Sequence, residues 1–168
     1  MIVEALLAEF DREMASTRKS LARVPWDRFD WKPHPKSMTL GRLATLLAEI
    51  PAWVPATLER ESLDLAPPGD RPFQPAFVSS SREVLELFDR NVEVARLALA
   101  KATEEGFGQP WSLLSGGKTI FTLPRLEVLR SLVLNHSVHH RAQLGVYLRL
   151  NDLPVPAIYG PSADEGSF

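Results

Sequence analysis

The sequence predicts an all-α protein, a four-helix bundle with one long crossover and a small β-hairpin between its third and fourth helices. Four segments carry apolar residues at helical spacings of three and four. A proline-rich stretch, residues 62–80, is long enough to cross the whole molecule. With 168 residues, the chain is expected to form one domain over residues 1–168. Long connections permit up-down-down-up topology, although they do not by themselves select it.

The first two helices are bounded by clear signals. The apolar stripe of the first stops before Pro25, so this helix is expected to end at about residue 24. The second begins behind Thr39, a suitable N-cap residue, and runs to about residue 61. Pro51 lies inside it and should kink it, because proline has no backbone N–H to donate.

The second half of the chain predicts two more helices and the hairpin. Ser80 and Glu83 form a capping-box pattern that opens the third helix, whose apolar stripe reaches Ala102. The segment "WSLLSGGKTIFTL", residues 111–123, is typical of two short strands joined at residues 115–117. The fourth helix is expected to run from Pro124 to Asn151.

The amino-acid composition excludes several classes of function and partner. The formal net charge is −2 and no basic run follows the chain, so nucleic acid is not expected as a partner. Because there is no cysteine, a disulfide framework, a thiolate nucleophile and a cysteine-ligated metal are excluded, and any metal needs nitrogen or oxygen ligands. The N-terminal segment is too acidic for a signal peptide and no stretch is apolar enough to span a bilayer, so a cytoplasmic protein without membrane contact is expected.

Histidines concentrate in "LNHSVHHRAQLGVYLRL", residues 134–150. At 100° per residue, His136 and His140 lie on the inward face of the fourth helix, about 5–6 Å apart, where two imidazoles can bind one cation. A pair of hydrogen-bonded core histidines is the commoner explanation of this spacing alone. His139 points to the flank, as a second-sphere or substrate contact. Ser137 stands where a metalloprotease of this spacing requires glutamate, which excludes that chemistry.

Two stretches, "NHSVHHRAQLGVYLRLNDLPVPAIYGPSADE" and "WKPHPKSMTLGRLATLLAEIPAW", closely resemble the DinB family, and the resemblance covers essentially the whole chain. It implies a four-helix bundle of up-down-down-up topology, often homodimeric. Many members hold a divalent metal, zinc or nickel, on three histidines, one from the second helix and two from the fourth. Characterised relatives include S-transferases that use bacillithiol or mycothiol and mycothiol-dependent maleylpyruvate isomerases.

The resemblance places the two fourth-helix ligands at His136 and His140. The second-helix ligand is missing, because the family pattern "LAxHxAEIP" reads "LATLLAEIP" here, with Leu46 in place of histidine. Glu49, one turn later, is a possible substitute ligand, although a solvated charge is the commoner role. His34 is another, although a histidine between two prolines more often packs in a loop.

Two further residues have possible roles at such a site. Arg141 could orient an acidic group of a substrate or interact with the helix dipole. Tyr147 could line the floor of a pocket or simply pack in the core. The resemblance implies a metal-dependent S-transferase or hydrolase, acting on a small molecule, whose open coordination positions hold water or a low-molecular-weight thiol. The alternative is a metal-free homodimer that has lost catalysis and binds a small molecule or a protein.

Overall fold

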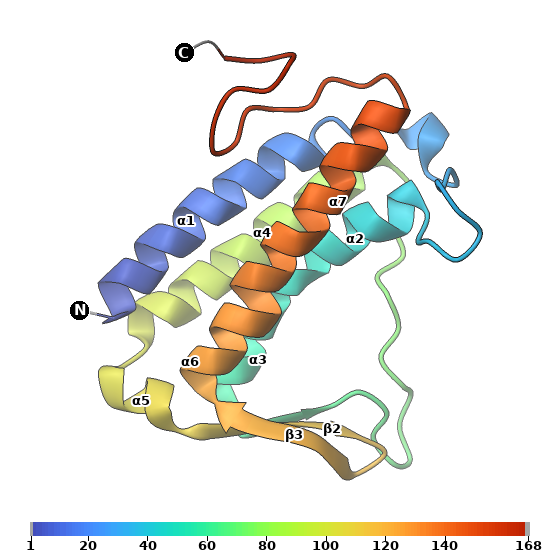
Figure 1. The fold of residues 1–168 in the computed structure, drawn as a ribbon. Helices are drawn as coiled ribbons and strands as arrows, with labels where there is room; N and C mark the ends of the chain where they lie inside the picture. The colour runs from blue at the N-terminus through green and yellow to red at the C-terminus, as the bar shows by residue number, and fades with distance from the viewer. Residues whose placement is uncertain (1, 167–168) are drawn as a thin grey trace.

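The computed structural model describes residues 2–166. Its elements are α1 (Ile2–Leu21), a 3₁₀ turn (Trp26–Arg28), α2 (Leu40–Glu49), a second 3₁₀ turn (Ile50–Ala52), α3 (Trp53–Glu59), β1 (Ser62–Asp64), α4 (Ser81–Lys101), α5 (Glu104–Gly108), β2 (Pro110–Ser115), β3 (Lys118–Pro124), α6 (Arg125–Val128), a π-helical segment (Leu129–Asn135) and α7 (His136–Leu150). The long helices lie alongside one another and the strands cover one end (Figure 1). None of the helices within residues 2–166 combines the length and the hydrophobicity needed to cross a membrane.

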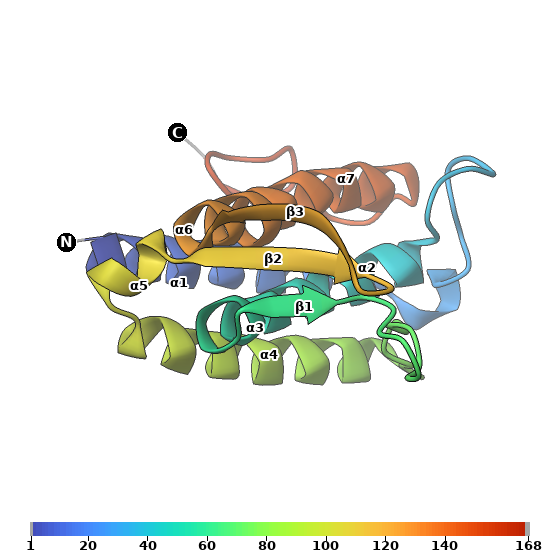
Figure 2. The same cartoon turned by 90° about the horizontal axis from the view of Figure 1, so that it is seen from below.

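The predicted fold class, an all-α four-helix bundle, is wrong. The structure contains a three-stranded mixed sheet in the order β1-β2-β3, and two of the expected continuous helices are each divided into several elements (Figure 2). The expected hairpin is present as β2 and β3, but β1 also pairs with β2, in parallel. A strand of three residues shows no recognisable alternation, so the sequence pattern could not reveal it.

Local chemistry explains how α2 begins and ends. The side chain of Thr39 accepts a hydrogen bond from the backbone N–H of Arg42, which confirms the predicted cap. Pro51 offers no N–H to the preceding turn, and the chain tightens into a 3₁₀ turn before it continues as α3. The expected kink is therefore a break between two helices.

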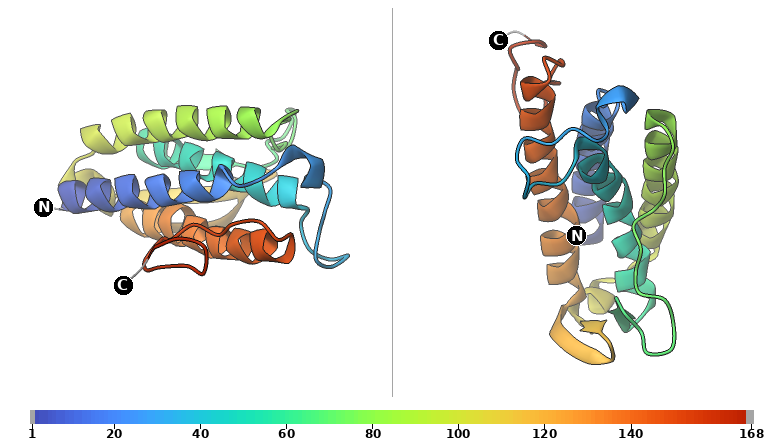
Figure 3. Two further views of the ribbon diagram at one scale, coloured as in Figure 1. Left: turned by 90° about the horizontal axis from the view of Figure 1, so that it is seen from above. Right: turned by 90° about the vertical axis from the view of Figure 1, so that its right-hand side faces the viewer.

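The proline-rich segment after β1 returns along the molecule, so that α3 and α4 run in the same direction (Figure 3). At its end, the Ser80 hydroxyl accepts from the backbone N–H of Glu83 and caps α4 as predicted. The Glu83 carboxylate accepts in turn from the backbone and the hydroxyl of Ser79. These contacts fix the point at which the crossover joins α4.

The sheet is fastened to the helices by one tryptophan and to its own turn by one aspartate. Trp111 is completely buried, and its indole N–H donates to the carbonyl of Ala56 in α3. Asp64 accepts from the backbone N–H groups of Gly116 and Gly117, at 3.0 and 2.7 Å. Both glycines have positive φ angles, 62° and 76°, which this tight turn requires and which other residues rarely adopt.

The last long helix changes from α-helical to π-helical geometry and back just before the histidines. It begins as α6, passes through the π-helical segment and continues as α7 from His136 onward. In a π-helical turn the backbone N–H of each residue bonds to the carbonyl of the fifth residue before it. The side chains of α7 therefore point in directions different from those that one uninterrupted α-helix would give them. Such segments are frequent at functional sites.

The main core is formed by the facing stripes of α1, α2, α4 and α7. Its fully buried side chains include Leu6, Phe10, Met14, Leu43, Leu47, Phe88, Leu99, Leu144 and Leu148. A second, smaller core of Trp111, Leu113 and Val128 lies under the sheet. Because α7 contacts both α1 and α2, its two sides face different partners. The histidines and Arg141 are divided between these two sides.

Candidate functional site

The centre of the candidate site is the pair His136 and His140 in the first turns of α7. Their Nε2 atoms are 2.8 Å apart and their ring centres 4.5 Å apart. His140 is 9% exposed and His136 is half-buried. At that distance the two nitrogens are within hydrogen-bonding reach, and the tautomers of the two rings set which of them carries a proton. The pair therefore turns one nitrogen of each ring toward the other.

Gln143 orients the pair. Its Oε1 lies 2.8 Å from Nδ1 of His140, and its Nε2 lies 3.0 Å from Nε2 of His139. In this orientation of the amide, Nδ1–H of His140 donates to Gln143, so Nε2 of the neutral His140 ring carries a lone pair. His139 is exposed and stands edge-on to His140, with ring centres 4.9 Å apart. It lies beside the pair in the flanking position predicted for it.

The environment of the pair disfavours the charged form of both rings. Burial is the largest cause that lowers the pKa of each ring below the usual 6.5. The charge of His140 lowers the pKa of His136 further, and His139 and Arg42 lower that of His140. Hydrogen bonds to the Leu132 backbone and to Gln143 act in the opposite direction. Neutral rings carry the lone pairs that a metal needs.

The lowered pKa values predict a pH dependence of stability. The unfolded chain takes up protons on these histidines as the pH falls through about 6.5, while the folded chain does so only at lower pH, so the free energy of unfolding should decrease below pH 6.5. It should level off above that value. Urea unfolding between pH 5 and 8 measures this. The double variant His136→Gln/His140→Gln should lose this part of the slope, and an unchanged slope would contradict the assignment.

A stripe of α2 stands near the pair and contains Arg42, Leu46 and Glu49. Arg42 Nη1 donates to Glu49 Oε2 at 2.8 Å, which closes an ion pair across the partly buried Leu46. The other Glu49 oxygen accepts from the backbone N–H of Ala76. Glu49 is only 9% exposed, so it is not the solvated charge that the sequence pattern favours. Helix α2 packs against α7, and the positive charge of Arg42 contributes to lowering the pKa of His140.

The donor set fits a divalent cation only in part. Two imidazole nitrogens that bind one zinc ion at 2.0–2.1 Å lie roughly 3.3 Å apart in tetrahedral geometry, close to the arrangement of this pair. Within residues 2–166, however, no group of three His, Asp or Glu side chains is placed to hold one ion. Leu46 offers no ligand, and the Glu49 oxygens already accept from Arg42 and Ala76. The residues thus supply two ligands and leave the remaining positions open.

Two other residues that the sequence suggested for the site, His34 and Tyr147, lie outside the histidine pair and have other partners. His34 is exposed in the loop before α2, where its Nδ1 accepts from the backbone N–H of Lys36 at 3.2 Å. Tyr147 is half-buried, packs edge-on against Trp31 and donates from its hydroxyl to the carbonyl of Met38. The Tyr147 contacts link the loop before α2 to α7, whereas the His34 contact stays within the loop, and neither side chain is bonded to the histidine pair.

Arg141 points away from the pair, toward α1. Its side chain is 4% exposed and donates to the carboxylate and the carbonyl of Glu13, to the Thr17 hydroxyl and to the Tyr159 hydroxyl. The Tyr159 hydroxyl donates to Glu13 at 2.6 Å, and burial, followed by this bond, raises its pKa. Arg141 therefore joins α1, α7 and the C-terminal segment, a contact that the sequence did not predict.

Sequence reasoning missed the roles of Arg42, Glu13 and Tyr159. A signal existed for Arg42, because positions 42, 46 and 49 are spaced to share one face of a helix. None existed for the other two, since the contacts that join them to Arg141 span 128 and 18 positions. Long-range pairing of this kind depends on how the helices pack.

Fold and site together define a class of helical protein in which the last long helix turns an i,i+4 histidine pair toward its neighbour. Residues 1–167 match the sequence model of the DinB family. The chain therefore belongs to that family.

Two solved structures show the same fold. A DinB-like protein from Bacillus cereus superposes with a TM-score of 0.67 at 23% identity, covering 93% of this chain and 97% of that one. A DinB-like protein from Bacillus subtilis gives a TM-score of 0.65 at 16% identity, covering 90% and 96%. At these identities the likeness extends to the fold alone. No curated protein matches the sequence.

Proposed function

We propose that this DinB-family protein holds a zinc or nickel ion between His136 and His140 and is a metal-dependent S-transferase or hydrolase acting on a small molecule. The observation that carries the proposal is the close approach of the two Nε2 atoms, 2.8 Å apart, on rings whose pKa values are lowered by burial. Such an ion lowers the pKa of a bound water or thiol and so supplies the nucleophile. A thiol has to be a separate small molecule, because the chain contains no cysteine.

The surrounding residues have defined tasks in this function. Gln143 fixes the ring of His140, as second-sphere partners of metal-binding histidines do. Leu46 supplies no ligand on the side of α2. The Arg42 guanidinium, held by Glu49, places a positive charge near the pair and favours an anionic or polarised substrate group there.

A second candidate function is favoured by the ion pair across Leu46. A fixed cation beside the histidines opposes a second positive charge, and a site with two protein ligands binds metal weakly. In this alternative the protein works without metal, keeps the histidines hydrogen-bonded to each other and binds a small molecule or a protein. A homodimer suits either candidate and is tested by light scattering in solution.

Metal titration decides between the two candidates. The metal-free protein should bind one zinc or nickel ion per chain in calorimetry, and the double variant His136→Ala/His140→Ala should lose this binding. His34→Ala is the matched control, because it removes an exposed histidine away from the pair. Binding that survives the double variant, or is lost in the control, would contradict the proposed site.

The enzymatic part is tested with electrophilic substrates. Thiol consumption and hydrolysis are followed for the metal-loaded protein, the metal-free protein and the double variant. Turnover should require both histidines and the ion. Stoichiometric metal binding without turnover would leave a binding protein and overturn the enzyme assignment.

A further inference from the structure

A guanidinium held by carbonyl groups lies at the end of the molecule where α3, α4, α5 and α6 meet (Figure 2). It belongs to Arg125, the first residue of α6, whose backbone N–H donates to the Gln109 carbonyl. Its terminal nitrogens donate to the carbonyls of Leu58 and Arg60 at the end of α3, at 3.1 and 3.2 Å. Carbonyl groups carry only partial charges, so they orient the guanidinium without neutralising it.

The two carbonyls satisfy the Arg125 guanidinium only in part. Within residues 2–166, its Nε atom is buried and has no hydrogen-bond partner. Each terminal nitrogen has one acceptor for its two N–H groups, and no carboxylate of these residues pairs with the side chain. A buried donor without an acceptor costs free energy, which a bound ion or water can recover. The arrangement therefore points to an acceptor that this part of the chain does not itself provide.

Arg125 borders a cavity of about 220 Å³, whose other charged side chains are those of Lys101 and Glu59. Among the described residues neither of these two forms an ion pair, so the lining carries two cations and one carboxylate. The Thr103 hydroxyl, which accepts from the Gly106 backbone N–H, has its own proton to donate. The volume lies below the roughly 300–1,000 Å³ of pockets for drug-sized ligands, so the cavity suits a small ion.

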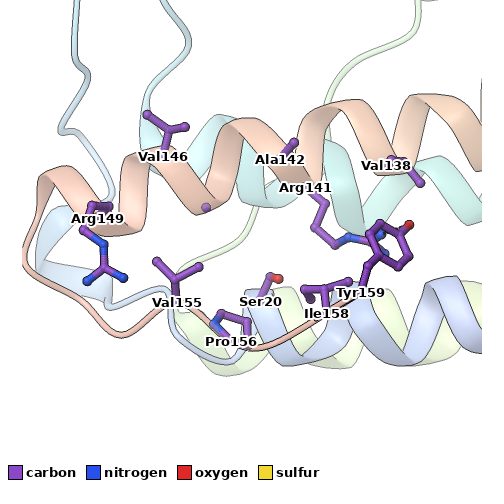
Figure 4. A pocket seen from close by; sticks show the side chains of 11 residues that line it. Ser20, Val138, Arg141, Ala142, Val146, Arg149, Val155, Pro156, Ile158 and Tyr159 are labelled. Atoms are coloured by element: carbon purple, nitrogen blue, oxygen red, sulfur yellow. Dashed lines mark hydrogen bonds between the residues drawn. The ribbon is translucent and has the colours of Figure 1, made fainter. Parts of the chain in front are cut away.

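The larger groove between α7 and the C-terminal segment differs in its charges (Figure 4). Its two guanidinium groups have carboxylate partners, Glu13 for Arg141 and Asp164 for Arg149. Both cations of that groove are therefore balanced within the chain. The Arg125 guanidinium has no such partner within residues 2–166, and this difference favours an anion at Arg125.

We propose that the cavity at Arg125 binds a small oxyanion of the phosphate type between the Arg125 guanidinium and the Lys101 ammonium. A guanidinium held in place offers its N–H groups to the oxygens in a planar fork, and the lysine adds a point charge. Glu59 opposes binding by repulsion and so sets an upper limit to the affinity. The site is separate from the proposed metal site, because His136 and His140 do not line this cavity.

Titration of the metal-free, ¹⁵N-labelled protein with inorganic phosphate tests the site, with sodium chloride at equal ionic strength as the reference. Phosphate should cause saturable shifts at residues 98–106 and 124–126. Lys101→Gln should weaken binding by about threefold, and Glu59→Gln should strengthen it by a similar factor, the scale of exposed charge interactions. Lys118→Gln is the matched control, because this exposed lysine of β3 lies outside the cavity, and it should bind as the native protein does.

Arg125→Gln tests the fixed guanidinium and should weaken phosphate binding by about tenfold or more. This variant also loses the contacts to α3, so circular dichroism has to show that it is folded. Arg125→Lys keeps the charge without the fork and should bind with intermediate affinity. If Arg125→Gln does not fold, Lys101→Gln and Glu59→Gln still decide the question, because both residues are exposed.

Three outcomes would overturn the proposal. Shifts that do not saturate, or that saturate away from the cavity, would show that phosphate has no site there. Lys101→Gln and Glu59→Gln both binding as the native protein does would remove the charges from the site. Phenyl phosphate should bind more weakly than free phosphate because the cavity is small, and tighter binding of this ester would overturn the assignment to a free ion. His136→Ala/His140→Ala should bind phosphate normally, which separates this test from that of the metal.

Discussion

Replacement of Arg141 by alanine is expected to destabilise the folded protein by about 3–5 kcal/mol, as for loss of one partner from a buried ion pair. The guanidinium is 4% exposed and the Glu13 carboxylate 13%. Without Arg141, that carboxylate stays buried with a single described donor, the Tyr159 hydroxyl. The C-terminal segment also loses one of its bonds to α7, while the pair between Arg149 and Asp164 remains. Urea denaturation at pH 7 measures the change.

Arg96→Ala is the matched control for this experiment. Arg96 also pairs with a carboxylate of α1, Asp11, but the two side chains are 52% and 41% exposed. An exposed pair of this kind contributes about 0–1 kcal/mol. Arg141→Lys keeps the charge without the planar fork and should fall between the two. A change below about 1 kcal/mol for Arg141→Ala would mean that the network contributes little to stability.

Replacement of Leu46 by histidine is expected to raise zinc or nickel affinity by about tenfold or more, the scale of one added good ligand. Arg42 and Glu49 flank Leu46 on one face of α2, and the positive charge of Arg42 contributes to lowering the pKa of His140. Because α2 packs against α7, a histidine at position 46 is expected to reach the pair and to restore the ligand that the family pattern provides. Calorimetric titration of both proteins measures the difference.

Two controls make this result specific. Leu46→Gln adds a polar side chain of similar size without an imidazole and should not raise the affinity. Leu46→His combined with His136→Ala and His140→Ala should not bind as the single variant does, because one histidine replaces three ligands. If Leu46→His titrates like the native protein, α2 does not face the pair at this position.

The sequence predicted most of the local elements, because short-range signals determine them. Thr39 and Ser80 cap their helices, Pro51 breaks α2, and the glycines at 116 and 117 form the turn of the hairpin. The i,i+4 spacing of His136 and His140 also placed the two rings together. These features depend on residues within a few positions of one another.

Tertiary structure decided the rest. Strand β1 joins the hairpin, and Arg141 contacts Glu13 and Tyr159, only because folding brings distant segments together. The ion pair between Arg42 and Glu49 is local in sequence, but it depends on which side chains folding buries. By itself the sequence determined the helices, the turns and the pair of histidines. Only packing decided which partners these residues meet, because the energy of a buried charge or an edge strand depends on neighbours that the local sequence does not specify.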